Sequence, residues 1–192
     1  MIFIKIPAEG GERKMKKYII LLIAVLTFLV LHEGAHLVVA HAFGEYEAFR
    51  LHFYGAEVIF KTPVELRSGI KWGFISGSAN LLSLTLGYLL LISCKRLAAL
   101  KSYFWRSFSY YIAFLFLLID AFNLSIGPFI YGGDIGGIVA GFGLNRYLVQ
   151  GIFLIILLLN RELIVQKLFP AFGVKTGHIL FQPLFKINTK GY

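Results

Sequence analysis

Residues 31–37, LHEGAHL, set three ionisable side chains into a long apolar run, and this run decides how the chain is organised. No charged residue stands between positions 18 and 31, and positions 37–43 are again mostly apolar. A run of this length and composition predicts a membrane-spanning helix over residues 18–43. The three ionisable side chains are therefore expected at membrane depth.

Residues 32–36 have the pattern H-E-x-x-H, which is typical of zinc metalloproteases. His32 and His36 are about one helical turn apart, so both imidazoles would project from one face and could bind Zn²⁺ with other positions left open. Glu33 could take a proton from a water molecule at that site. Ionisable groups in lipid cost several kcal/mol without partners, which favours a functional site. The alternative interpretation is a polar contact between helices.

The composition is that of an integral membrane protein. Of the 192 residues, 58% are hydrophobic and 15% are charged, whereas soluble domains carry about 25% charged residues. The length allows four or five spans in one core domain, residues 18–168, between a polar lead (1–17) and a basic tail (169–192). The single cysteine, Cys94, excludes a disulfide framework and a cysteine-based zinc site. The first apolar run is too long for a signal peptide, although Met15 could be the first residue.

The net charge of +9 does not indicate a nucleic-acid partner, because the basic residues cluster at the ends of apolar runs. If successive loops alternate sides, fourteen of the nineteen Lys and Arg residues lie on the side of the N-terminus. The positive-inside rule then places the N-terminus in the cytoplasm. We expect a multi-pass protein of the cell membrane, embedded in the lipid bilayer. The sequence gives no indication of its oligomeric state.

Three further spans are expected, over residues 70–93, 107–126 and 147–165. The predicted fold is therefore an all-α polytopic membrane protein. Residues 45–61 alternate apolar and polar side chains around Tyr54-Gly55, which predicts a small β-hairpin at the membrane surface after the first helix. The hairpin could pair with an extended substrate or serve only as a connector. Residues 94–106 are predicted to form a basic interfacial loop.

Four polar residues in or beside the later spans need an explanation. Asn80 could hold helices together or orient a substrate. Asp120 and Asn123 are three residues apart and share one helical face, and Asp120 needs a partner in lipid. Asp134 lies in a glycine-rich segment, residues 127–143, that interrupts the helical pattern. Such a break at membrane depth is tolerated only where the backbone is buried in protein or lines a cavity.

Three blocks together resemble the site-two protease family of intramembrane zinc metalloproteases. The H-E-x-x-H motif and the residues up to Gly44 resemble the family's zinc helix. Residues 76–82, SGSANLL, resemble its Gly-Pro-x-Ala-Asn block, and residues 122–137 resemble its Asn-Leu-x-Pro and Asp-Gly segment. The hairpin also has a counterpart in the family. The resemblance covers about residues 18–137.

The resemblance implies a role for six residues: the zinc ligands His32, His36 and Asp134, the catalytic base Glu33, and Asn80 and Asn123 in the substrate groove. Two positions depart from the family pattern. Gly77 stands where the family has proline, and Ile135 separates Asp134 from the following glycines. Asp120 therefore stays an alternative third ligand, and Glu162 is a more distant one.

The resemblance implies cleavage of a transmembrane or membrane-proximal segment of a substrate protein, as in regulated intramembrane proteolysis. Two alternatives stay open. One is a membrane-anchored metalloprotease that acts on soluble chains at the membrane face, and the other is a non-catalytic membrane binding protein. The family places the C-terminal end of its zinc helix near the cytoplasm, which is the reverse of the charge rule, so the orientation stays open too.

Overall fold

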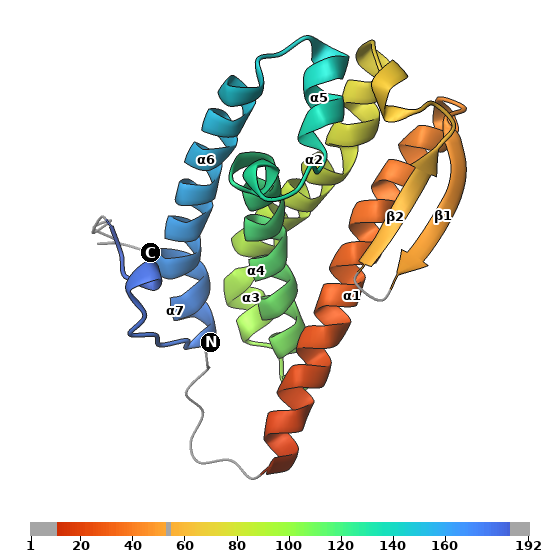
Figure 1. Cartoon of the computed structure of the whole chain (residues 1–192). Coiled ribbons are helices and arrows are strands. Elements are labelled where there is room, and N and C mark those ends of the chain that lie inside the picture. Colours follow the sequence, from red (N-terminus) through yellow and green to blue (C-terminus); the bar gives the residue numbers. More distant parts are fainter. Residues whose placement is uncertain (1–10, 53–54, 185–192) are drawn as a thin grey trace.

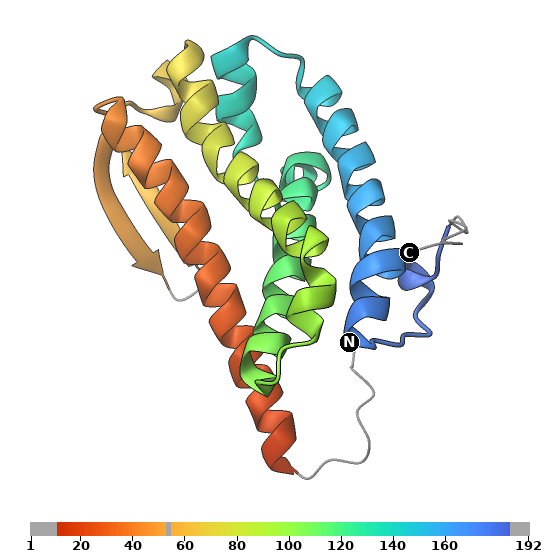
Figure 2. The same cartoon turned by 180° about the vertical axis from the view of Figure 1, so that it is seen from behind.

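The computed structural model describes residues 11–52 and 55–184 (Figures 1 and 2). The predicted turn residue Tyr54 lies outside the described residues. The helices and strands, in chain order, are α1 (Gly11–Ala42), β1 (Tyr46–His52), β2 (Gly55–Phe60), α2 (Ile70–Ile92), α3 (Cys94–Ala98), α4 (Tyr103–Ser125), α5 (Ile135–Phe142), α6 (Arg146–Leu163) and α7 (Phe169–Phe172). Three short 3₁₀ turns cover Val64–Leu66, Gly127–Phe129 and Ile179–Phe181, and a π-helical turn, Ile164–Leu168, joins α6 to α7.

Four helical segments in the described part of the chain are long and apolar enough to cross a membrane. They are Met15–Ala42, Ile70–Ile92, Tyr103–Ser125 and Arg146–Phe172. The third segment, α4, is the most buried of them and packs against α1, α2 and α6, so it forms the centre of the bundle (Figures 1 and 2). The predicted fold, an all-α polytopic membrane protein with a small hairpin after its first helix, is confirmed.

A buried amide ties three helices of the bundle together. Asn160 in α6 is fully buried and donates a hydrogen bond to the carbonyl oxygen of Leu117 in α4 at 2.7 Å. Its own amide oxygen accepts a hydrogen bond from the hydroxyl of Tyr88 in α2, also at 2.7 Å. Because an unpaired amide is costly in an apolar surrounding, these two bonds favour one arrangement of α2, α4 and α6.

Glycines bring α5 unusually close to α2. A Cβ atom at Gly137 would overlap the Ser76 side chain, and one at Gly141 would overlap the backbone of Gly73. Small residues at a membrane-helix contact permit this approach. Residues 127–143, which the sequence predicts to interrupt the helical pattern, therefore contain a packed helix, α5. The packing fixes the start of α5, where Asp134 stands.

The predicted hairpin lies along the C-terminal half of α1 (Figure 1). Its strands β1 and β2 pair antiparallel, with Phe49 opposite Val58. Glu45, just before β1, accepts hydrogen bonds from Thr62 Oγ1 at 2.7 Å and from Lys71 Nζ at 2.5 Å. The hydrogen bonds from Lys71 and Thr62 lower the pKa of the Glu45 carboxyl. The hairpin is thereby tied to the first turn of α2.

The predicted interfacial loop over residues 94–106 is wrong in most of its length. Cys94–Ala98 form the short helix α3. The helix α4 begins as early as Tyr103, because the Ser102 side chain accepts a hydrogen bond from the backbone N–H of Trp105 and caps the helix. The sequence reasoning overlooked this N-cap.

Two other helices are longer than predicted. The first begins at Gly11 rather than at residue 18, since Lys and Arg are good helix formers and let the helix extend into the polar lead. The last continues to Phe172, past the predicted end of the core at residue 168. The π-helical turn stands directly before the end of this helix, where Pro170 lacks a backbone N–H.

The four long helices alternate in direction. The start of α1, the short helix α3 and α7 lie at one end of the bundle, while the 3₁₀ turn before α2 and the connection from α5 to α6 lie at the other (Figures 1 and 2). This alternation is the arrangement that the charge count assumes. The orientation of the bundle in the membrane stays a prediction.

Candidate metal centre

The two histidines of the motif lie on one buried face of α1. His32 and His36 are both buried, with exposed fractions of 8% and 5%. Their ring centroids are 5.0 Å apart and the rings stand nearly perpendicular, at 84°. Phe28, one turn earlier, stacks on His32 with a centroid distance of 5.6 Å. The helical spacing thus brings both imidazoles together, as the sequence predicts.

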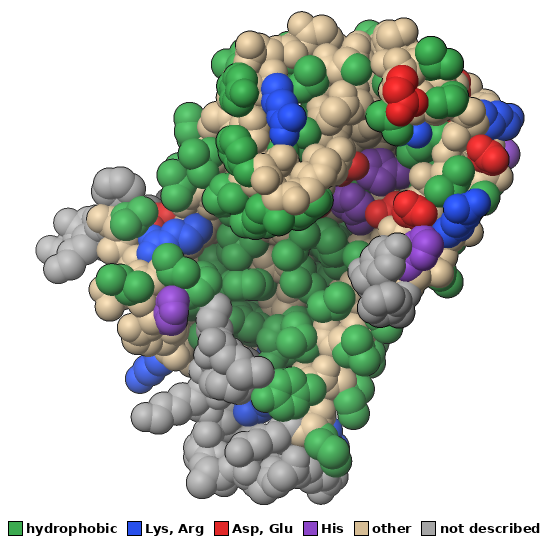
Figure 3. Space-filling view, in the orientation of Figure 1, with side chains coloured by type: hydrophobic (Ala, Val, Ile, Leu, Met, Phe, Trp, Pro, Cys, Tyr) green, Lys and Arg blue, Asp and Glu red, His purple; other side chains and the backbone are tan. Residues whose placement is uncertain are grey.

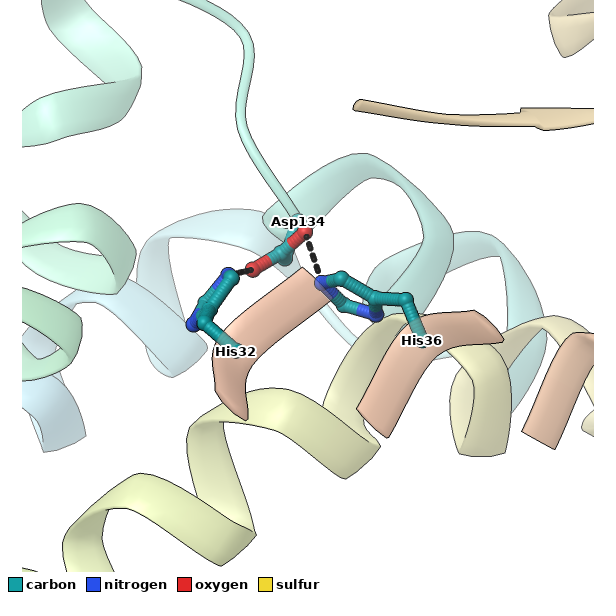
Figure 4. A group of neighbouring side chains, drawn as sticks. All are labelled: His32, His36 and Asp134. Carbon is teal, nitrogen blue, oxygen red and sulfur yellow. Dashed lines mark ion pairs between the residues drawn. The ribbon is translucent and has the colours of Figure 1, made fainter. Parts of the chain in front are cut away.

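Asp134 faces both imidazoles from the start of α5 (Figure 4). Its Oδ2 atom is 3.4 Å from His32 Nε2, and its Oδ1 atom is 3.2 Å from His36 Nε2. The three side chains form a group whose ligand atoms all lie within 4.8 Å of one another. Two elements far apart in the sequence therefore present two nitrogens and a carboxylate to one point.

These three side chains could hold a metal ion. Two imidazoles and one carboxylate are the donor set of many catalytic zinc sites, which keep the fourth position open. The separations of 3.4 and 3.2 Å join the two Nε2 atoms to different oxygens of Asp134 and are ion-pair distances between the side chains themselves.

The other nitrogen of each imidazole contacts an oxygen acceptor. Nδ1 of His36 is 2.7 Å from the carbonyl oxygen of Ile75 in α2. Nδ1 of His32 is 3.1 Å from Oδ1 of Asp120 in α4, whose side chain is fully buried. An acceptor at Nδ1 leaves the Nε2 lone pair free to bind a metal. Of the two candidate third ligands, Asp134 lies on the Nε2 side of His32 and Asp120 on the opposite side.

Two amides hold Asp134 in place. Nδ2 of Asn80 donates a hydrogen bond to Asp134 Oδ2 at 2.8 Å, and Nδ2 of Asn123 donates to the same oxygen at 3.2 Å. Both asparagines are buried, at 2% and 8% exposure. The resemblance to the site-two protease family implies a substrate groove for these residues; the structure brings both to the carboxylate of Asp134. Their predicted contact with a substrate stays a prediction.

Glu33 directly follows His32 in α1, and its side chain is half-buried, whereas both imidazoles are buried. The strand β2 packs against α1. The role of Glu33 as the base stays a prediction.

Glu162, the more distant candidate ligand, has another role. It lies outside the group formed by the histidines and Asp134. Its carboxylate pairs with Arg161 and accepts a hydrogen bond from the backbone N–H of Leu184 at 3.1 Å. Glu162 therefore holds the C-terminal segment against α6.

The molecule is hollowed on one face beside the candidate centre. Figure 3 shows hydrophobic side chains lining a depression between α1 and α6, with histidine and acidic side chains at its border. An apolar approach that ends at polar groups is suited to a peptide segment that arrives from lipid.

No protein-family model, no curated protein and no solved structure matches this chain. The resemblance to the site-two protease family therefore stays a prediction that rests on the sequence motifs.

Proposed function

We propose that this protein is an intramembrane zinc metalloendopeptidase of the cell membrane that cleaves a transmembrane or membrane-proximal segment of another protein. One observation carries the proposal. The Nε2 atoms of two buried imidazoles and the carboxylate of Asp134 converge inside an apolar bundle, with a second carboxylate, Glu33, directly beside them in sequence.

His32, His36 and Asp134 would hold the zinc ion. When bound, zinc supplies Lewis acidity that polarises the scissile carbonyl and makes water a stronger nucleophile. Glu33 accepts a proton from the attacking water as the oxygen bonds to the carbonyl carbon. It then delivers that proton to the leaving amine as the C–N bond breaks, so that the carboxylate is regenerated.

The hairpin would present the substrate to this site. A helical peptide bond is already hydrogen-bonded and sterically shielded, so the substrate must be extended where it is cut. Strand β2 packs against α1, the helix that carries Glu33, and an extended peptide can pair with an exposed strand edge. The hydrophobic hollow beside the centre would accept the apolar side chains of such a segment.

The test compares wild-type protein with Glu33→Gln and Asp134→Ala, purified in detergent and reconstituted in lipid. We expect about one zinc per chain in wild type and in Glu33→Gln, and little in Asp134→Ala. Cleavage of a reporter with an apolar transmembrane segment should be lost in both variants. The control is Glu65→Gln, an equal chemical change at an exposed position outside the site, which should keep both zinc and activity.

Four results would contradict the proposal. Wild type without tightly bound metal would exclude the metal centre. Zinc binding without any peptide cleavage would favour a non-catalytic binding protein, and cleavage that survives Glu33→Gln would show that Glu33 is not the base. Glu33-dependent cleavage of soluble unfolded chains, with the membrane reporter left intact, would instead favour a membrane-anchored protease that acts at the membrane face.

A further inference from the structure

Asp120 is a fully buried carboxylate in the centre of the bundle. Its side chain is 0% exposed, and α4 is the most buried of the four long helices. In the described part of the chain, neither of its oxygens meets full hydrogen-bond geometry with any group. His32 Nδ1, at 3.1 Å from Oδ1, is its one partner at ion-pair distance there. Because a carboxylate buried in an apolar surrounding is costly without a polar partner, the contact with His32 is expected to stabilise the Asp120 carboxylate.

The contact lies on the side of His32 that faces away from Asp134. Nε2 of His32 faces Asp134 at 3.4 Å, whereas Nδ1 faces Asp120. The two ring nitrogens point in divergent directions, so one metal ion bound at Nε2 is out of reach of Asp120. The two carboxylates therefore have different roles toward the same imidazole.

We propose that Asp120 is a positioning residue that acts through His32. Its carboxylate would accept a hydrogen bond from Nδ1–H of the ring, which selects the tautomer with a lone pair on Nε2 and aims that lone pair at the metal centre. The inference rests on the metal site of the proposed function. Such a carboxylate also makes the imidazole a stronger ligand than a neutral acceptor would.

The second imidazole supports this assignment. His36 Nδ1 contacts the Ile75 carbonyl at 2.7 Å, so both rings have an acceptor behind Nδ1 and turn Nε2 toward Asp134. The two acceptors belong to different helices, α4 for His32 and α2 for His36. Stacking by Phe28 adds a further restraint on the His32 ring.

The experiment measures zinc affinity of the full chain in detergent by competition with a chelator of known affinity. Asp120→Asn should raise the zinc Kd about 10–100-fold, the range typical of lost partners behind a ligand histidine. Asp134→Asn should lose more, because it changes a ligand. Asn160→Ala is the matched control: it removes another fully buried polar group that contacts α4 at Leu117 and should lower the unfolding temperature without changing the Kd.

Two spectroscopic measurements separate positioning from a structural role. With Co²⁺ in place of zinc, Asp120→Asn should keep the strong visible absorption of a four-coordinate site with shifted band positions, while Asp134→Asn should lose it. In zinc-loaded wild type with ¹⁵N-labelled histidine, His32 should be protonated at Nδ1 and metal-bound at Nε2. The second measurement needs no variant, so it stands even where Asp120→Asn does not fold.

The outcomes distinguish this inference from the proposed function. An unchanged Kd in Asp120→Asn, with zinc bound by wild type, would overturn the positioning role and leave the protease proposal intact. Metal bound at Nδ1 of His32, or a cobalt spectrum lost in Asp120→Asn but kept in Asp134→Asn, would make Asp120 the ligand. Wild type that binds no zinc would overturn both.

Discussion

Replacing Gly141 by alanine should weaken the metal centre from a distance. An added Cβ would overlap the backbone N and Cα of Gly73 in α2, and it would lie 2.9 Å from the carbonyl carbon of Trp72. These are backbone atoms, so no side chain can turn away to relieve the overlap. The nearest of them, Gly73 N, would lie 1.9 Å from the added Cβ, whereas ordinary contact begins near 3.4 Å, so α5 and α2 must separate by about 1.5 Å.

This shift is large for a metal site. Asp134 directly precedes α5, and metal–ligand distances are held within about 0.2 Å. A displacement of about 1.5 Å should therefore raise the zinc Kd of Gly141→Ala at least about tenfold. Overpacking of this kind also destabilises a protein by about 1–3 kcal/mol. Zinc competition and thermal unfolding, both in detergent, measure the two effects.

Gly136→Ala is the control for this prediction. Gly136 lies in the same helix, is exposed, and has nothing within 4 Å of an added Cβ. Alanine there should leave the zinc Kd unchanged and alter stability by up to about 1 kcal/mol in the favourable direction, since alanine is the better helix former. If Gly141→Ala matches Gly136→Ala in both affinity and stability, then α5 does not hold Asp134 by close packing, and the reasoning is refuted.

Two further predictions concern polar contacts. Asn80→Leu removes the 2.8 Å hydrogen bond to Asp134, and Asn123→Leu removes the 3.2 Å one. Asn80→Leu should therefore raise the zinc Kd more than Asn123→Leu does. If both variants bind zinc as tightly as wild type and only the KM of cleavage changes, these amides bind the substrate instead. The hydrogen bond from Lys71 holds the pKa of Glu45 below its ordinary value of 4.5. This contact therefore stabilises the folded protein above pH 4.5, and its contribution is lost as the pH falls through the lowered pKa. The unfolding temperature of Lys71→Met should therefore fall less than that of wild type between pH 7 and pH 3, and identical curves would contradict this explanation.

The parts of the molecule that local sequence determines were the parts that could be predicted. An uncharged run of sufficient length specifies a membrane span, and the four-residue step from His32 to His36 specifies a shared helical face. The alternation after Gly44 specifies strands. Each of these inferences needs only neighbours in the chain, and the structure has the spans, the paired imidazoles and the hairpin.

The parts that depend on contacts between helices could not be predicted. Asp120 and Asp134 are both acidic residues near apolar segments, and nothing local says which of them faces Nε2 of His32. That distinction arises only when α4 packs against α1 and α5, held against α2, brings Asp134 to His32. The sequence also does not distinguish a helical break from a close helix contact at Gly137 and Gly141, because glycine suits both.

The three candidate metal-binding side chains are each held by groups from α2, α4 or both. Asp120 in α4 contacts His32, the Ile75 carbonyl in α2 contacts His36, and amides from α2 and α4 contact Asp134. Inside a membrane these polar groups have no water to turn to, so each contact both joins helices and orients a ligand. Apolar helix contacts tolerate small shifts that a metal site does not. Variants that remove one of these contacts should therefore lose zinc affinity before the spans unfold, which is why affinity and unfolding temperature have to be measured on the same variants.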